Sequence, residues 1–286
     1  MVAAMGSAEV DSTHTVRHGD PACEPEMQTI ALELAYRGTD FSGFARQTNA
    51  RTIQGELEHA LATLAGYPIA TVCAGRTDAG VHARAQVISC TIPSELIAQK
   101  SQTIRSLNAL ISDDISIQSM RCAPQGFSAR FDAIARQYRY RIVTGSTAPV
   151  FSRDYVWYVP HELDIDAMRV AARYLVGEHD FSAFCVTKSA EELHGKGLAT
   201  CRRIDSIEFF EEHIMGEYIH AIDIEGNAFL HSMVRVIVGT LVEVGYGKRT
   251  SEWVKDVLES RDRQAAGQTA PAKGLMLQTV DYPAQK

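Results

Sequence analysis

The chain has 286 residues, of which 45% are hydrophobic and 22% are charged, and its formal net charge is −7. This length and apolar content are enough for one large domain or two ordinary ones. No apolar run approaches the roughly 20 residues that a membrane-spanning helix needs, and no basic start followed by an apolar run marks a secretory signal. The six cysteines are scattered without a CxxC pair, which argues against a zinc site or a disulfide framework and fits a reducing cytosol.

Charge is distributed unevenly along the chain. Residues 1–27 hold five acids and one base, whereas residues 76–153 hold ten bases and five acids. A local basic region suits contacts with RNA phosphates, although bases on solvent-facing strands would give the same count. Residues 1–27 are polar and acidic with no periodic apolar pattern, so we predict a disordered tail or a remnant of expression there.

The first half of the remaining chain mixes strand and helix patterns. Alternating or short apolar runs predict strands over residues 29–36, 71–74, 85–92 and 115–121. Apolar residues spaced three and four apart predict helices over residues 53–64 and 102–110, the first preceded by the capping residue Thr52.

Between two of these strands lies the segment Gly75-Arg76-Thr77-Asp78-Ala79-Gly80. Its glycines favour a tight turn or loop that presents Asp78. An aspartate in such a turn most often bonds its own backbone, and the alternative is a functional carboxylate. No metal-ligand cluster, phosphate loop or nucleophile elbow accompanies it.

The second half repeats the mixture. We predict a strand over 136–143, a helix over 164–176 closed by Gly177, a hairpin of 204–210 with 218–225, helices over 229–244 and 251–259, and a strand over 279–282. Because the elements follow no strict βαβ rhythm, they predict an α+β fold with an antiparallel sheet. We place a boundary near residue 135.

These motifs together resemble the tRNA pseudouridine synthase A (TruA) family. The most specific is the string AGRTDAGVHARAQV around Asp78, and the similarity spans about residues 28–283. Weaker motifs follow in family order at residues 36–44, 52–58, 107–110, 127–131, 136–140, 179–181, 227–235 and 272–275. The resemblance implies a pseudouridine synthase fold, with two ferredoxin-like halves (residues 28–135 and 136–286) whose sheets combine between flanking helices.

The resemblance also implies an activity. Such enzymes convert uridine to pseudouridine at positions 38, 39 and 40 of the tRNA anticodon arm. They use no cofactor or metal and act as cytoplasmic homodimers on tRNA, with no membrane or DNA partner. Two readings compete with it: a non-catalytic RNA-binding module on the same scaffold, and a pseudouridine synthase with another RNA target. A hydrolase using Asp78 would lack metal ligands and a phosphate cradle.

Five residues match the family's functional positions. Asp78 is the expected nucleophile and Arg235 its partner, while Arg76, Tyr138 and Leu275 are expected to hold the flipped nucleotide. Attack on the base at C6, attack on the sugar at C1′ and elimination at the sugar all remain open for Asp78. Each residue also has a structural interpretation. Arg235 could cap its own helix or pair with Glu243, and the other three could be a surface arginine, a strand tyrosine and a core leucine.

The histidines near these motifs are predicted to be structural. His82 and His231 are expected to bond backbone, and the neighbouring pair His179 and Asp180 is expected to cap a helix. The chain departs from the usual family pattern at Arg37, at Phe44–Gln47 and at Ser112, where family members usually have Asp, Trp-Gln-Arg-Gln and Pro. These departures affect expected RNA contacts and loop stiffness, and none falls on the five residues above.

Overall fold

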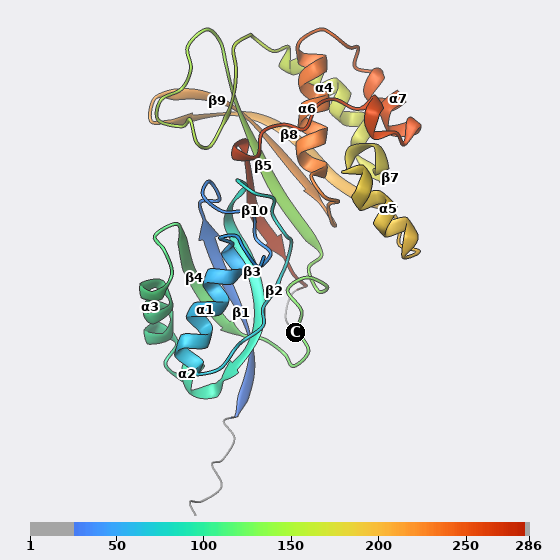
Figure 1. Cartoon of the computed structure of the whole chain (residues 1–286). Helices are drawn as coiled ribbons and strands as arrows, with labels where there is room; N and C mark the ends of the chain where they lie inside the picture. The colour runs from blue at the N-terminus through green and yellow to red at the C-terminus, as the bar shows by residue number, and fades with distance from the viewer. Residues whose placement is uncertain (1–25, 284–286) are drawn as a thin grey trace, which may run out of the picture.

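The computed structural model describes residues 26–283, so the predicted tail lies outside the described residues except for Glu26 and Met27. The described chain forms one ten-stranded sheet with α-helices packed beside it (Figure 1). The strands are β1 (Met27–Tyr36), β2 (Val72–Cys73), β3 (His82–Pro93), β4 (Ile115–Cys122), β5 (Ala135–Thr144), β6 (Trp157–Val159), β7 (Gly177–Asp180), β8 (Cys201–Ile214), β9 (Glu217–Gly226) and β10 (Leu275–Asp281). The helices are α1 (Ile53–Ala65), α2 (Ser94–Ala98), α3 (Lys100–Leu110), α4 (Ile165–Ala172), α5 (Thr187–Gly195), α6 (Met233–Gly245) and α7 (Trp253–Ser260).

Two groups of four strands have the same neighbour order. One group runs β4-β1-β3-β2 and the other β10-β5-β9-β8, and every pairing inside each group is antiparallel. The groups meet where β10 runs parallel to the start of β3, and β6 also lies parallel to β5. The sheet is therefore mixed, which corrects the prediction of an antiparallel sheet. The cause is β10: antiparallel pairing with β5 fixes its direction, and that direction is parallel to β3.

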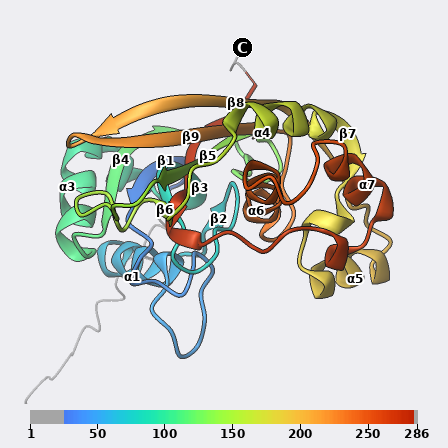
Figure 2. The same cartoon turned by 90° about the horizontal axis from the view of Figure 1, so that it is seen from above.

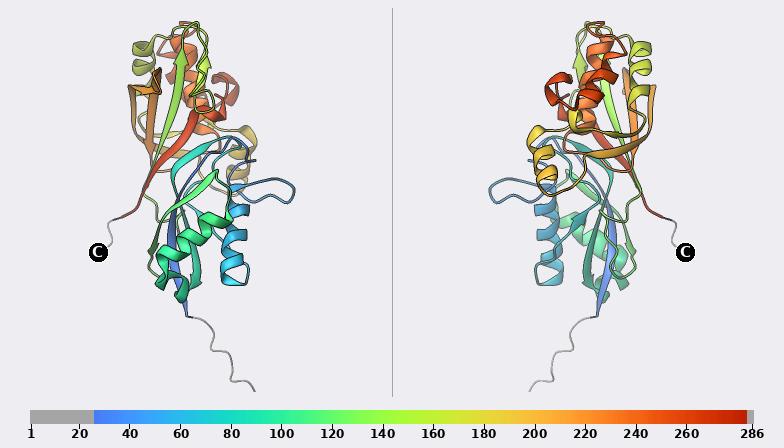
Figure 3. Two further views of the ribbon diagram at one scale, coloured as in Figure 1. Left: turned by 90° about the vertical axis from the view of Figure 1, so that its left-hand side faces the viewer. Right: turned by 90° about the vertical axis from the view of Figure 1, so that its right-hand side faces the viewer.

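The helices gather on one side of the sheet, as the view from above shows (Figure 2). Their apolar side chains and the inward-facing side chains of the strands form the main core. On β5, Tyr138, Tyr140 and Ile142 point into this core because they occupy alternate positions of one strand. Helix α6 is buried along nearly its whole length, as its run of valine, isoleucine and leucine requires. In side view, the segment between β1 and α1 projects from the body (Figure 3).

Local signals explain the starts of α1 and α4. The Thr52 hydroxyl accepts a hydrogen bond from the Gly55 amide at the start of α1, and the Asp164 carboxylate does the same for the Ala167 amide at α4. Residues 173–175 continue α4 as a 3-10 turn, and Gly177 follows with a φ of 112°. Helix α6 begins at Met233, later than predicted, because Ser232 has a left-handed backbone. The sequence did not predict α2, α5, β6 or β7.

Candidate active site

A carboxylate and a guanidinium from distant parts of the chain meet beside the β2–β3 loop. The Asp78 Oδ2 atom lies 2.8 Å from Arg235 Nη1, and it also accepts a hydrogen bond of 2.8 Å from the Ser232 hydroxyl. His231 Nε2 lies 3.4 Å from the other oxygen, Oδ1. The side chains of Asp78 and Arg235 are 22% and 18% exposed, so the pair is shielded from solvent without being sealed. The fold therefore joins the two residues that the resemblance had paired.

Helix α6 and the loop residue Ala270, which precedes β10, hold Arg235 in place. Its Nε donates to the Ala270 carbonyl at 2.8 Å, and the Ala270 amide donates to the Arg235 carbonyl at 3.1 Å. Glu243, the alternative partner considered for this arginine, instead lies 3.5 Å from Lys248 Nζ. With its neighbours buried in the core, the Arg235 side chain has the anion that a largely buried arginine requires.

The loop that carries Asp78 is fixed from several directions. The Tyr36 hydroxyl lies 2.7 Å from Thr77 Oγ1, and Gln86 Nε2 donates to the Gly75 carbonyl at 2.7 Å. The Phe44 amide donates to the Thr77 carbonyl, and Arg136 Nη2 donates to the Ala74 carbonyl, each at 3.0 Å. The Asp78 side chain thus bonds Ser232 and Arg235 rather than its own backbone, and the simple turn interpretation does not describe it.

Tyr138 lies next to this loop. Its ring packs edge-on against Phe229 with centroids 5.2 Å apart, and a Cβ on Gly75 would stand 3.5 Å from its hydroxyl oxygen. Burial raises the pKa of the Tyr138 phenol; the Arg136 charge opposes this rise and the Asp78 charge adds to it. The phenol therefore stays protonated near neutral pH and can donate a hydrogen bond.

The other two predicted residues sit differently. Arg76 is exposed and, within residues 26–283, makes no hydrogen bond or ion pair. Leu275 begins β10 opposite Tyr140 and is 6% exposed in the main core. Their roles toward a nucleotide stay predictions.

The histidines divide into two kinds. His82 is buried, with Nδ1 accepting from the Gly38 amide at 3.0 Å and Nε2 lying 3.1 Å from the Asp154 carbonyl, and burial lowers its pKa. This confirms a structural role. Asp180 receives hydrogen bonds from the Ser182 amide and the Thr200 hydroxyl, and His179 faces the Val176 carbonyl. The N-cap of the following 3-10 turn Ser182–Phe184 is Phe181, without a side-chain capping bond, so the predicted capping role is not observed. His231 differs from its prediction, because it is exposed and lies against the Asp78 carboxylate.

The sequence analysis missed Ser232 and the residues that fix the loop. The only signal for Ser232 was its place between His231 and Arg235 in a motif already noted, and nothing in the sequence predicted its backbone conformation. Gln86 and Arg136 also lie within motifs already noted, but nothing in the sequence predicted that their side chains bond carbonyl groups of the loop.

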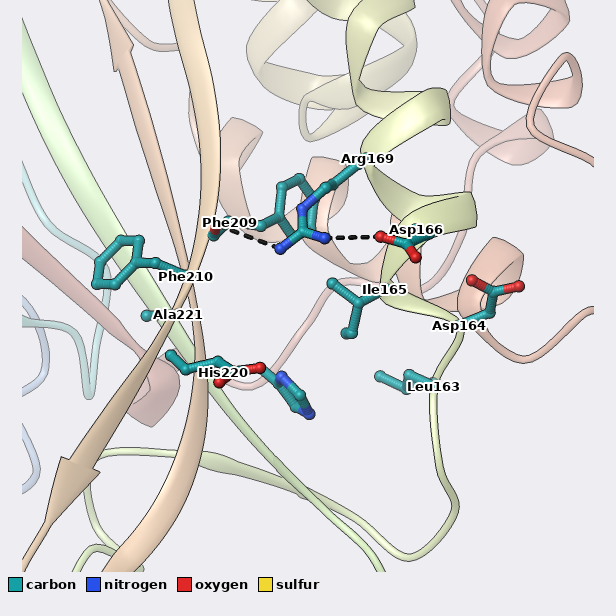
Figure 4. Close-up of a pocket in the computed structure, with 10 residues that line it drawn as sticks. Leu163, Asp164, Ile165, Asp166, Arg169, Phe209, Phe210, His220 and Ala221 are labelled. Atoms are coloured by element: carbon teal, nitrogen blue, oxygen red, sulfur yellow. Dashed lines mark hydrogen bonds and ion pairs between the residues drawn. The ribbon is translucent and has the colours of Figure 1, made fainter.

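A separate pocket lies between the start of α4 and the β8–β9 hairpin (Figure 4). There Arg169 bonds Asp166 and reaches toward the Phe209 carbonyl, and His220 lines the opposite side. None of the five predicted residues lines it. Within residues 26–283, no cluster of three or more His, Cys, Asp or Glu is arranged to hold a metal ion, and no helix is long and apolar enough to cross a membrane.

Comparison with known proteins defines the class of protein. The family described as tRNA pseudouridine synthase matches residues 171–283, which include Arg235 and Leu275. Curated proteins named tRNA pseudouridine synthase A match most of the chain. The protein from Halalkalibacterium halodurans is 42% identical over 87% of this chain and 91% of its own length. The proteins from Fervidobacterium nodosum (42%; 89% and 99%) and Bacillus subtilis (41%; 88% and 98%) are similar.

The site and these matches define an isomerase of the pseudouridine synthase class. Within that class, the chain belongs to the tRNA pseudouridine synthase A family. Among solved structures, a protein of unknown function from Galdieria sulphuraria covers 78% of the chain at 13% identity with a TM-score of 0.19, which is too low to bear on the fold.

Proposed function

We propose that this chain converts uridine to pseudouridine at positions 38, 39 and 40 of the tRNA anticodon arm, with Asp78 as the nucleophile. The observation that carries the proposal is the contact of Asp78 Oδ2 with Arg235 Nη1 at 2.8 Å, in a chain of this family. The names of these relatives specify tRNA and do not specify the modified position.

The reaction suits one fixed carboxylate. The bond between uracil N1 and ribose C1′ breaks, the base turns, and C5 joins C1′ while the C5 proton leaves and N1 takes one up. No electrons are gained or lost. An aspartate must be ionised to act as a nucleophile, and a nearby guanidinium favours the ionised form. At an effective dielectric of 20, two unit charges 4 Å apart attract by about 4 kcal/mol, which opposes the cost of shielding the carboxylate from water.

A uridine stacked in an RNA arm must leave the stack to reach Asp78. Tyr138 is placed beside the loop to meet the flipped base, where an aromatic contact contributes about 1–3 kcal/mol. Arg76 is exposed two residues before Asp78, which suits entry into the space that the base leaves. Leu275 would then support the base from the core side.

The proposal extends to the organisation of the protein. We assign residues 28–135 and 136–286 to two ferredoxin-like halves, supported by the matching orders β4-β1-β3-β2 and β10-β5-β9-β8. We also propose a cytoplasmic homodimer with tRNA lying across both subunits. The free cysteines of the described chain fit a reducing compartment.

The test is modification mapping. Purified protein is incubated with unmodified tRNA transcripts, without added metal or nucleotide, and pseudouridine is located by carbodiimide labelling and primer extension. We expect stops at uridines 38 to 40 with the wild type and with Asp166→Asn, an exposed aspartate away from the site, and none with Asp78→Asn. The Asp78→Asn variant should still bind tRNA within a few-fold.

Other outcomes separate the alternatives. Stops at other uridines would keep the chemistry and change the target. Tight tRNA binding without product from folded wild-type protein would favour the non-catalytic RNA-binding module. Full turnover by Asp78→Asn would remove this residue from the mechanism.

A further inference from the structure

The two oxygens of the Asp78 carboxylate have different surroundings. Oδ2 accepts two hydrogen bonds of 2.8 Å, one from the Ser232 hydroxyl and one from Arg235 Nη1. No hydrogen bond from the described residues reaches Oδ1, whose nearest ring nitrogen is His231 Nε2 at 3.4 Å. The His231 side chain is 53% exposed, so it is held less firmly than the two groups on Oδ2. One oxygen is therefore fixed by the protein, and the other is free to meet a reacting atom.

Ser232 makes its contact at a structural cost. Its φ of 59° and ψ of 11° lie in the left-handed region, which residues other than glycine and asparagine rarely adopt. It also occupies the N-cap position of α6, where a serine hydroxyl normally accepts a hydrogen bond from a backbone amide of the first turn. Here the hydroxyl makes no such bond and instead donates to Asp78.

The two contacts on Oδ2 come from one end of one helix. Ser232 precedes α6 and Arg235 is its third residue, so a rigid element carries both donors. If Arg235 were the only partner, the Asp78 carboxylate could rotate about its Cβ–Cγ bond, because the guanidinium would remain near one oxygen or the other. A second donor from another direction removes that freedom. Residues with a strained backbone are common at functional sites. Ser232 is such a residue, and its hydroxyl bonds the Asp78 carboxylate.

We propose that Ser232 is a positioning residue that locks Asp78 Oδ2 together with Arg235 and leaves Oδ1 as the oxygen that attacks the target nucleotide. This inference rests on the proposed function, because it assigns a task within that reaction. It requires the serine hydroxyl to donate a hydrogen bond to the carboxylate, because ionised aspartate only accepts hydrogen bonds.

Three substitutions separate the hydroxyl from the backbone conformation. Ser232→Ala removes the hydroxyl and keeps the strain, whereas Ser232→Gly removes the hydroxyl and relieves the strain. Ser232→Asn tolerates the left-handed conformation and restores a donor group. Ser251→Ala is the matched control, because it removes a serine hydroxyl that bonds the Ala167 carbonyl, away from Asp78.

Single-turnover rates of pseudouridine formation at saturating enzyme are compared with tRNA dissociation constants and thermal unfolding. We expect Ser232→Ala and Ser232→Gly to slow the chemical step about tenfold to a hundredfold, with tRNA binding within about threefold of wild type. Ser232→Asn should recover most of the rate, and Ser251→Ala should match wild type. Ser232→Gly should unfold at a higher temperature than Ser232→Ala.

A wild-type rate in Ser232→Gly would overturn the proposal, because the hydroxyl would then be dispensable. If the wild-type protein makes no pseudouridine at any uridine, the proposed function is rejected. Crystal structures of wild type and Ser232→Ala then test separately whether Ser232 positions the Asp78 carboxylate. One carboxylate orientation in wild type and two in the variant would support the lock, while an unchanged carboxylate would overturn it.

Discussion

The β2–β3 and β8–β9 connections occupy the same place in their two groups of strands, yet they are built differently. Strands β8 and β9 stay paired to the last residues, Ile214 with Glu217, and a two-residue turn closes them. Both turn residues, Met215 and Gly216, have positive φ values, as tight hairpins require. Between β2 and β3, by contrast, residues 75–81 leave the strand pairing and bond to other elements.

The contrast between the two connections shows how one of two similarly ordered groups of strands comes to carry the Asp78 site. A short turn satisfies its own backbone, so its residues need no contact with other elements. The longer loop must find partners elsewhere, and it finds them in Tyr36, Phe44, Gln86 and Arg136. Those partners are also what hold Asp78 at a fixed point. Four experiments, given in decreasing order of expected effect, test whether the two connections differ in this way.

The largest effect should come from the ion pair at the β2–β3 loop, compared with an ion pair within the second group of strands. We expect Arg235→Gln to lower the rate of pseudouridine formation by about a hundredfold or more, because the carboxylate loses its charged partner. Arg139→Gln breaks an ion pair with Asp223 between β5 and β9, and it should leave the rate within about twofold. Single-turnover assays measure both. A comparable loss in Arg139→Gln would mean that the site depends on the second group of strands as a whole.

Next come two glycines. A Cβ on Gly38 would lie 2.0 Å from the Val81 carbonyl oxygen, so the loop itself would have to shift. We expect Gly38→Ala to lower the free energy of unfolding by about 2–4 kcal/mol. Gly216→Ala meets no atom within 4 Å and should cost about 1–2 kcal/mol, the usual penalty of a left-handed alanine. Urea unfolding checks the ranking, and the reverse order would show that the hairpin is the more constrained connection.

A smaller effect is expected for Tyr36→Phe. The variant loses the hydrogen bond to Thr77 Oγ1 but keeps the ring in the core. It should cost about 1 kcal/mol of stability and slow turnover a few-fold through loss of loop order. Tyr158→Phe, which loses a bond to the Gly145 carbonyl beyond the end of β5, serves as the control and should not change turnover. Equal slowing in both variants would contradict a specific role for the loop.

The smallest effect concerns pH. Burial lowers the pKa of His82, so the stability it provides is complete above its unfolded value of about 6.5 and is lost as pH falls below it. Hydrogen bonds from Ser152 and from the backbone of residues 150–152 lower the pKa of Glu217 to about 2. Its contribution is therefore lost only between about pH 4.5 and 2.

Amide hydrogen exchange, corrected for intrinsic rates, can follow both regions. The Gly38 amide, bonded to His82 Nδ1, should lose protection first on acidification, and the amides of residues 150–152 should stay protected to lower pH. Simultaneous loss in both regions would refute separate acid responses.

Sequence reasoning predicted the parts that local physics controls. The cap at Thr52, the alternation of β5 and the valine-rich α6 all carry short-range signals. The pairing of Asp78 with Arg235 was expected only through the family resemblance, because 157 positions separate the two residues. The left-handed Ser232 and the carbonyl bonds of Gln86 and Arg136 were not predicted, since they depend on tertiary contacts that leave no periodic pattern. The parallel seam of β3 and β10 was missed for the same reason.

That seam has a consequence for how the protein is made. Strand β10 fills the central gap of the sheet, although it is the latest of the ten strands to leave a ribosome. Until it arrives, β3 and β5 each expose an unpaired edge, and the Ala270 carbonyl that steadies Arg235 lies just upstream of it. We therefore expect nascent chains halted before residue 270 to collapse into two unjoined parts that are prone to aggregate. Catalytic competence would arrive in one late step, when β10 closes the sheet.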